Sequence, residues 1–271
     1  MKLFRHIILA LASLLALSCG KEVQPECNDQ MLTVQYGITV DAPTKALGDG
    51  KTATHVWYAL YRAADGSLVS TCETPAKIDS DRKAICPVTM AKDQDYKVVF
   101  LAMYYEGATP AYTVDAQFKT VSMPSQAQPN SDKFDLFYGV DEVVDFQGTQ
   151  NTNVELTRVV AQVNFELSET AWNDLHVDQT YKSQIQISGA PASMNILNGT
   201  LGAAATISYA QTQIPAERRN IGTAYCFATA AGDQKVEASI SLYTAAGDEV
   251  KTTFATAVPV AANRQTNLKI N

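Results

Sequence analysis

The chain has 271 residues, of which 46% are hydrophobic, a composition typical of a packed globular protein and not of a disordered one. Its formal net charge of −7 argues against nucleic acid as a partner. After the first residues, no apolar stretch reaches the roughly 20 residues that a membrane-spanning helix needs.

The N-terminus has the features of a secretory signal peptide. Two basic residues precede an uninterrupted apolar stretch, residues 7–17, that is too short to cross a bilayer. The stretch leads into Ala-Leu-Ser-Cys, which resembles the lipobox of bacterial lipoproteins; the alternative is a plain signal peptide with an incidental cysteine. The resemblance implies that residues 1–18 are removed and that Cys19 is diacylated and anchors the protein in the membrane. The formal charge then becomes −9, because two basic residues and no acidic ones are lost, and residues 19–28 form a polar, flexible stalk.

The chain beyond residue 28 is expected to form one short strand after another. The clearest alternation runs from residue 32 to residue 40, where one face carries Leu32, Val34, Tyr36, Ile38 and Val40. Further strands are expected at residues 55–62, 67–74, 83–90 and 95–105. The last of these is apolar on both faces, which is typical of a central strand. The proline-containing residues 123–135 are predicted to form a long polar loop.

A second series of strands begins at residue 153. It is expected at residues 153–167, 183–189, 205–210, 223–230, 235–245, 249–260 and 265–271. A short helix capped by Ser168 is expected to follow the first of them. The polar residues 145–153 are the best candidate for a domain boundary. We therefore predict an all-β fold of two β-sandwich domains, residues 29–147 and 148–271.

Four cysteines remain besides Cys19, and an exported protein can oxidise them. Cys72 and Cys86 lie in the two flanking segments of an expected hairpin, at equal distances from its centre. They could therefore face each other, either as a disulfide or as two free thiols. No histidine lies near either cysteine, so the spacing does not indicate a zinc site.

No pattern of residues indicates catalysis, and we predict no cofactor and no metal. His55 and His176 have no catalytic or metal-binding context, and nucleotide-binding and hydrolase motifs are absent from the sequence. Acidic pairs at residues 79–81, 93–95 and 141–145 could be fragments of a calcium loop, but they lack the glycine and the terminal glutamate of an EF-hand. Solvated turns are the expected role of these acidic residues.

Five segments occur in the order seen in the fimbrillin-like lipoproteins of Bacteroidota, the superfamily that includes the type V pilus subunits. They read TKALGDGKTATHVWYALYRAADGSLV, KDQDYKVVFLAMY, NVELTRVVAQVNF, SGAPASMNILNGTL and VPVAANRQTNLKI. The series includes a Leu-x-Arg-x-x-Ala element at Leu156, Arg158 and Ala161. The chain resembles this superfamily from the lipobox almost to the C-terminus. The resemblance implies two transthyretin-like β-sandwich domains, export as an outer-membrane lipoprotein and a role in assembly or adhesion at the cell surface, with other fimbrial subunits or with host or bacterial surface proteins as partners.

One feature departs from the polymerising members of that superfamily. In those members, a protease cuts after an arginine near the start of the N-terminal domain, which removes a strand and opens a groove for a strand of another subunit. Here no arginine lies between Cys19 and Arg62, and Lys45 stands where the cut is expected. The departure favours an uncleaved protein that keeps the strand at residues 32–40, either an anchor or accessory subunit or a free-standing surface lipoprotein.

Some alternatives stay open. A glycan-binding lipoprotein of a polysaccharide-uptake system would share the anchor and the tandem β domains, and exposed coplanar aromatic rings would favour it. Trp57 and Tyr61 share one face of a strand, although core packing is the expected role of both. The C-terminal segment, residues 266–271, could be a donor strand or an edge strand of its own domain. Arg158 could pair with a carboxylate at the domain junction, but we expect it to face solvent.

Overall fold

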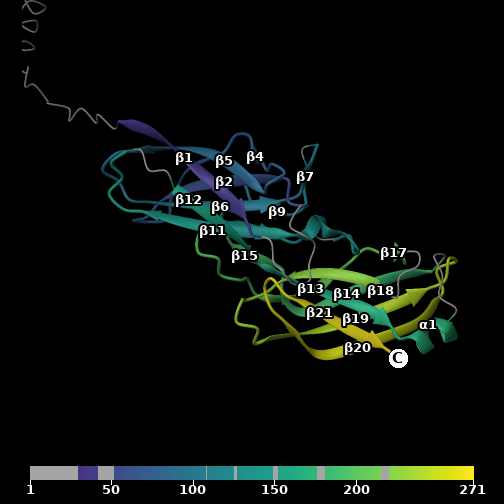
Figure 1. Ribbon diagram of the computed structural model, residues 1–271. Coiled ribbons are helices and arrows are strands. Elements are labelled where there is room, and N and C mark those ends of the chain that lie inside the picture. The colour runs from purple at the N-terminus through teal and green to yellow at the C-terminus, as the bar shows by residue number, and fades with distance from the viewer. Residues whose placement is uncertain are drawn as a thin grey trace, which may run out of the picture. The chain divides into compact units, whose positions relative to one another are not determined.

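The computed structural model describes residues 30–41, 52–107, 109–124, 127–148, 152–175, 181–214 and 220–271. Within them the chain folds into strands and turns, with one short α-helix and one 3-10 helix (Figure 1). The predicted all-β fold is confirmed. Residues 31–271 form one unit by their mutual contacts. Among the described residues, no helix is long and apolar enough to cross a membrane.

The N-terminal sheet has eight strands in the order β3-β2-β6-β11-β12-β1-β5, with β4 paired to β2. Its strands are β1 (Met31–Val40), β2 (His55–Arg62), β3 (Leu68–Thr71), β4 (Ala76–Lys77), β5 (Lys83–Ala91), β6 (Tyr96–Met103), β11 (Leu136–Val143) and β12 (Thr152–Arg158). The expectation that residues 95–105 form a central strand is confirmed, since β6 lies between β2 and β11.

This sheet folds over on itself at β12. Residues 152–156 of β12 pair in parallel with β1, whereas residues 157–158 pair with β11. The two arms of the sheet enclose a hydrophobic cluster, which includes Val34 and Ile38 from β1, Val56 from β2 and Phe100 from β6. β12 therefore belongs with the strands that precede it, and the chain changes sheets at Val159. The division into domains at residues 147 and 148 remains a prediction.

The rest of the chain contributes two further sheets and a helix. One sheet has the order β18-β13-β21, and the other has β16-β14-β19-β20 with β17 paired to β14. The elements are β13 (Val160–Leu167), α1 (Glu169–Leu175), β14 (Lys182–Pro191), β16 (Ala204–Ser208), β17 (Thr212–Gln213), β18 (Asn220–Phe227), β19 (Gln234–Tyr243), β20 (Glu249–Val260) and β21 (Gln265–Ile270). The hydroxyl of Ser168 accepts a hydrogen bond from the backbone N–H of Ala171, as expected of an N-cap.

These two sheets approach closely at Gly222 of β18. A Cβ atom there would lie 2.7 Å from Cδ1 of Ile185 and 2.9 Å from Cδ1 of Ile240, so no larger residue fits without movement of its neighbours. The hydrophobic cluster around this point also includes Tyr61 and Leu101 of the N-terminal sheet. One continuous core therefore joins strands from both halves of the sequence.

Short strands complete the fold. A small sheet has the order β15-β10-β9, and a two-stranded ladder joins β7 and β8. Their bounds are β7 (Tyr105–Glu106), β8 (Thr109–Pro110), β9 (Thr113–Val114), β10 (Thr120–Ser122) and β15 (Ser193–Asn195), and the 3-10 helix η1 covers Asp132–Phe134. β15 comes from the second half of the chain and pairs with β10 from the first, so this sheet also links the two halves.

Candidate functional site

Strand β1 is hydrogen-bonded on both of its edges. It pairs antiparallel with β5, from Met31 opposite Ala91 to Thr39 opposite Lys83. On its other edge, residues 36–40 pair in parallel with the first residues of β12, and Figure 1 shows β1 alongside both neighbours. β1 is thus an interior strand of the sheet, and its removal would leave an open slot between β5 and β12.

The expected alternation of buried and exposed residues is present along β1. Val34, Tyr36, Ile38 and Val40 are buried, and Leu32 is half-buried. Full burial of an aliphatic side chain stabilises a fold by roughly 1.5–3 kcal/mol, so Val34, Ile38 and Val40 together contribute about 4.5–9 kcal/mol. Whole domains are stable by only about 5–15 kcal/mol. Loss of β1 would therefore remove much of the stability of the fold.

Tyr36 ties β1 to the opposite arm of the sheet. Its hydroxyl donates a hydrogen bond of 2.9 Å to Oδ2 of Asp141 in β11, and its ring lies 5.1 Å from that of Phe100 in β6. Burial raises the pKa of the Tyr36 phenol, and the charge of the Asp141 carboxylate raises it further. The phenol therefore stays protonated at physiological pH and remains a hydrogen-bond donor to Asp141.

A groove of about 750 Å³ lies beside the last residues of β1. Gly37 lines it, and a Cβ atom at this residue would lie 2.5 Å from Oδ1 of Asn153, so the glycine leaves room for that side chain. Ile85 of β5, which is 67% exposed, lines it together with Lys77 and Lys83. Residues of β1, β4 and β5 line the groove, and so do Asp79 and Asn153, the second residue of β12.

Arg158 is buried, not exposed to solvent as we expected. Its guanidinium donates a 2.8 Å hydrogen bond to Oδ2 of Asp135, and both side chains are almost completely inaccessible. The guanidinium also lies 5.1 Å from the centre of the Phe137 ring and 3.5 Å from Oδ1 of Asn263. Arg158 ends β12 where the chain passes from one sheet to the next, and Asp135, Phe137 and Asn263 surround its guanidinium there. The alternative that it pairs with a carboxylate is the one observed.

The environment of Asp135 has opposing effects on its ionisation. Burial raises the pKa of the Asp135 carboxyl to about 7, while the Arg158 guanidinium lowers it and the Asp132 carboxylate raises it. The ionised form depends on Arg158 for compensation of its charge, because an unpaired charge is costly at a buried site. The pair therefore couples the stability of this junction to pH.

The segment from Asn130 to Asp135 holds distant parts of the chain together, although we predicted it as part of a polar loop. The Asn130 side chain accepts a hydrogen bond from the backbone N–H of Thr223, and Asp132 accepts one from the hydroxyl of Tyr225. Ser131 caps η1, as the sequence Ser-Asp-Lys could have indicated. The partners lie about 90 residues away in the sequence, so local patterning cannot reveal them.

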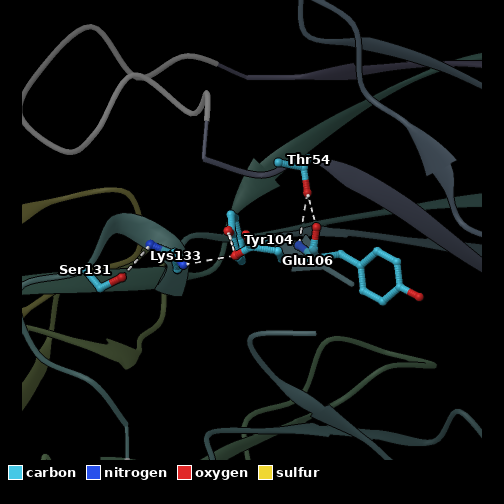
Figure 2. A network of polar contacts seen from close by, with 6 residues as sticks. Thr54, Tyr104, Glu106, Ser131 and Lys133 are labelled. Atoms are coloured by element: carbon cyan, nitrogen blue, oxygen red, sulfur yellow. Dashed lines mark hydrogen bonds and ion pairs between the residues drawn. The ribbon is translucent and has the colours of Figure 1, made fainter. Parts of the chain in front are cut away.

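An exposed polar network continues from η1 to β7. Figure 2 shows Lys133 reaching from η1 toward Glu106, and the two charged groups lie 3.4 Å apart. The hydroxyl of Tyr104 donates to the same carboxylate, and the Lys133 ammonium lies 4.4 Å from the centre of the Tyr104 ring. The hydroxyl of Thr54 bonds to both the N–H and the carbonyl of Tyr105. These contacts hold β7 against η1 and the start of β2.

The aromatic residues beside this network do not form a flat platform. The rings of Trp57 and Tyr105 meet edge to face, with centres 5.3 Å apart and planes at 88°, and His55 packs on Tyr105 at 78°. Tyr61 is buried and donates its hydroxyl to the carbonyl of Phe118. The coplanar exposed rings that would favour glycan binding are therefore not formed by these residues.

Cys72 and Cys86 do not lie in one hairpin, so the predicted hairpin is wrong. β3 pairs with β2, whereas β5, which contains Cys86, pairs with β1. Both cysteines nevertheless line the same pocket, and both are free thiols. Burial raises the pKa of the Cys86 thiol to about 12. Disulfide formation between them remains a prediction.

Of the other residues singled out in the sequence, some lie outside the described ranges and the rest make ordinary structural contacts. Cys19, Lys45 and His176 lie outside the described residues. His55 is half-buried, and burial together with the charge of Lys77 lowers its pKa. Asp79 accepts hydrogen bonds from two backbone N–H groups of its own turn. Within the described ranges, no three His, Cys, Asp or Glu side chains come together as a metal site.

Comparison with known proteins identifies the family. A protein-family model described as a family of unknown function (DUF6562) matches residues 26–271. The chain belongs to this family. No curated protein sequence matches it.

Solved structures share the fold at low sequence identity. A candidate polysaccharide-binding protein (DUF1812) from Bacteroides thetaiotaomicron is 14% identical, with 88% of this chain and 90% of that chain covered at a TM-score of 0.56. A candidate adhesin from Bacteroides ovatus is also 14% identical, with 82% and 76% covered at a TM-score of 0.53. A candidate cell adhesion protein from Bacteroides fragilis is 13% identical, with 88% and 92% covered at a TM-score of 0.50. At such identity, these similarities establish the fold alone.

Proposed function

We propose that this member of the DUF6562 family is a non-enzymatic surface lipoprotein of the fimbrillin-like type. Acyl chains on Cys19 hold it in the outer membrane, and edge strands or loops contact protein partners, as in a fimbrial anchor or accessory subunit or a free-standing adhesion protein. The observation that carries the proposal is that β1 is paired on both edges and contributes four fully buried side chains.

While β1 fills the slot between β5 and β12, a strand of another subunit cannot enter it. In strand addition, an incoming segment gains main-chain hydrogen bonds and side-chain pockets only where a strand is missing. Here β1 already forms main-chain hydrogen bonds with the inner edges of both β5 and β12. A subunit that keeps β1 cannot accept a strand at this position, so it would end a chain of strand exchange or act alone.

The position of Arg62 supports retention of β1. Arg62 is the last residue of β2, where it lies opposite Tyr96 of β6, and its guanidinium donates to Oε1 of Gln94. A cut after Arg62 would separate both β1 and β2 from the rest of the chain. β2 carries Leu60 and Tyr61, which are completely buried, so this cut would expose core residues on both faces of the strand.

Mass spectrometry of the mature N-terminus tests the proposal on protein taken from its native cell envelope. The expected N-terminal peptide begins at a lipid-modified Cys19, and a Cys19→Ala variant serves as the matched control without the lipid. An N-terminus at Ala46 or Ala63 in most molecules would show that β1 is removed for strand exchange. The protein would then be a polymerising subunit, and the proposal would be wrong.

A further inference from the structure

The two edges of the folded N-terminal sheet come together at a pair of cysteines. β3 and β5 stand at opposite ends of the strand order. Cys72 follows β3 directly, Cys86 lies within β5, and both line one pocket of about 240 Å³. The fold-over at β12 therefore brings the segment after one edge strand against the other edge strand.

The walls of this pocket show how the two thiols are held. The backbone N–H of Cys72 donates a 3.3 Å hydrogen bond to the carbonyl of Tyr58, which fixes the segment after β3 to β2. Cys86 lies opposite Tyr36 in the β1–β5 register and is buried in the same cluster as Val56. Tyr58 lines the same pocket as both cysteines, and burial raises the pKa of its phenol.

We propose that Cys72 and Cys86 form a disulfide in the mature protein, which joins the two open edges of the N-terminal sheet. Each thiol gives up its hydrogen and a sulfur–sulfur bond forms. The two protons and two electrons pass to a disulfide-bonded protein oxidant of the cell envelope, whose own disulfide becomes two thiols. The step rests on the export included in the proposed function, because disulfides persist in oxidising compartments.

Such a bond would act on the strand beside β1. β5 is held laterally by β1 alone in the strand order, so a covalent link from Cys86 to the segment after β3 fastens β5 independently of β1. It would close a loop of about 15 residues and restrict the unfolded chain accordingly. The slot that contains β1 would then have one wall fixed by a covalent bond.

Tryptic peptide mapping without reduction tests the bond. Reduced, purified protein is unfolded, refolded with oxidised glutathione, treated with iodoacetamide in denaturant, where buried thiols can react, and digested. The expected product is peptide 63–77 joined to peptide 84–92, while Cys226, which lies in the other hydrophobic cluster, carries the alkyl label. Separate, alkylated 63–77 and 84–92 peptides would overturn the proposal, and this result does not depend on export.

The same mapping on protein from the native envelope separates the two proposals. Linked peptides support the disulfide in the cell. Unlinked peptides in molecules with a lipid-modified Cys19 would overturn the disulfide while leaving the proposed function intact. Unlinked peptides in molecules that keep residues 1–18 would overturn the proposed export and, because the oxidation rests on that export, the disulfide in the cell as well.

A stability measurement provides a second readout. Cys72→Ser is expected to lower Tm by roughly 6–12 °C in oxidising buffer, the shift expected when a disulfide closing a loop of this length is lost from a unit of this size. The same variant serves as its own control in reducing buffer, where its Tm should match that of the reduced wild-type protein. An equal Tm for both proteins in oxidising buffer would contradict the proposal.

Discussion

Removal of the Arg158 guanidinium should destabilise the protein strongly. Arg158→Met keeps the length of the side chain but leaves the Asp135 carboxylate buried without its 2.8 Å partner. Loss of one member of a buried ion pair costs about 3–5 kcal/mol. That loss is a large share of the roughly 5–15 kcal/mol that stabilises a typical domain, so the variant should unfold at a clearly lower urea concentration than the parent.

The matched control is Arg62→Met, because Arg62 makes an exposed hydrogen bond to Gln94. An exposed polar contact of this kind contributes at most about 1 kcal/mol. Urea unfolding of the chain without residues 1–19 at pH 8, followed by circular dichroism, compares the two variants directly. If Arg158→Met and Arg62→Met lower the free energy of unfolding by the same amount, the buried pair does not support the junction.

The cost of Arg158→Met should also depend on pH. The folded-state pKa of Asp135 is already raised to about 7, above its ordinary value of 3.8, so its contribution to stability falls as pH rises through that range. Without Arg158 the pKa of Asp135 rises further, so the free energy of unfolding of the variant keeps falling as pH rises above 7. The difference between wild type and Arg158→Met should therefore grow as pH rises above 7. The double variant Arg158→Met/Asp135→Leu carries no buried charge here, so it should recover most of the stability and lose this pH dependence.

Further predictions concern β1 and its processing. Ile38→Ala should lower the free energy of unfolding by about 2–5 kcal/mol, because the side chain is buried in β1. The control Ile85→Ala, on the exposed face of β5, should change it by at most about 0.5 kcal/mol. Equal urea midpoints for the two variants would contradict the assigned faces. Lys45→Arg should create a site for an arginine-specific protease, so that N-terminal sequencing detects Ala46 after digestion of the variant and not of wild type. Cleavage of both proteins at this position would refute the argument from the missing arginine.

Strand positions could be predicted to a large extent from the sequence. The predicted ranges 55–62 and 249–260 coincide with β2 and β20, and the alternation in residues 32–40 matches the burial along β1. β11 was missed, although its Leu-Phe-Tyr start is apolar, because Gly139 and the acidic residues 141–142 interrupt its pattern. Residues 153–167 were predicted as one strand, and the break at Val159 separates β12 from β13.

The sequence by itself determined the all-β character and the inward face of β1, because the alternation of side chains along a strand is a local property. Only the tertiary structure decided which strands pair, and so placed β1 between β5 and β12 and brought Cys72 near Cys86 across the fold-over. It also decided that Arg158 is buried. A single arginine is equally compatible with a solvated and a paired position, and the choice depends on Asp135 and Asn263, which the chain brings to it from about 20 and 100 residues away.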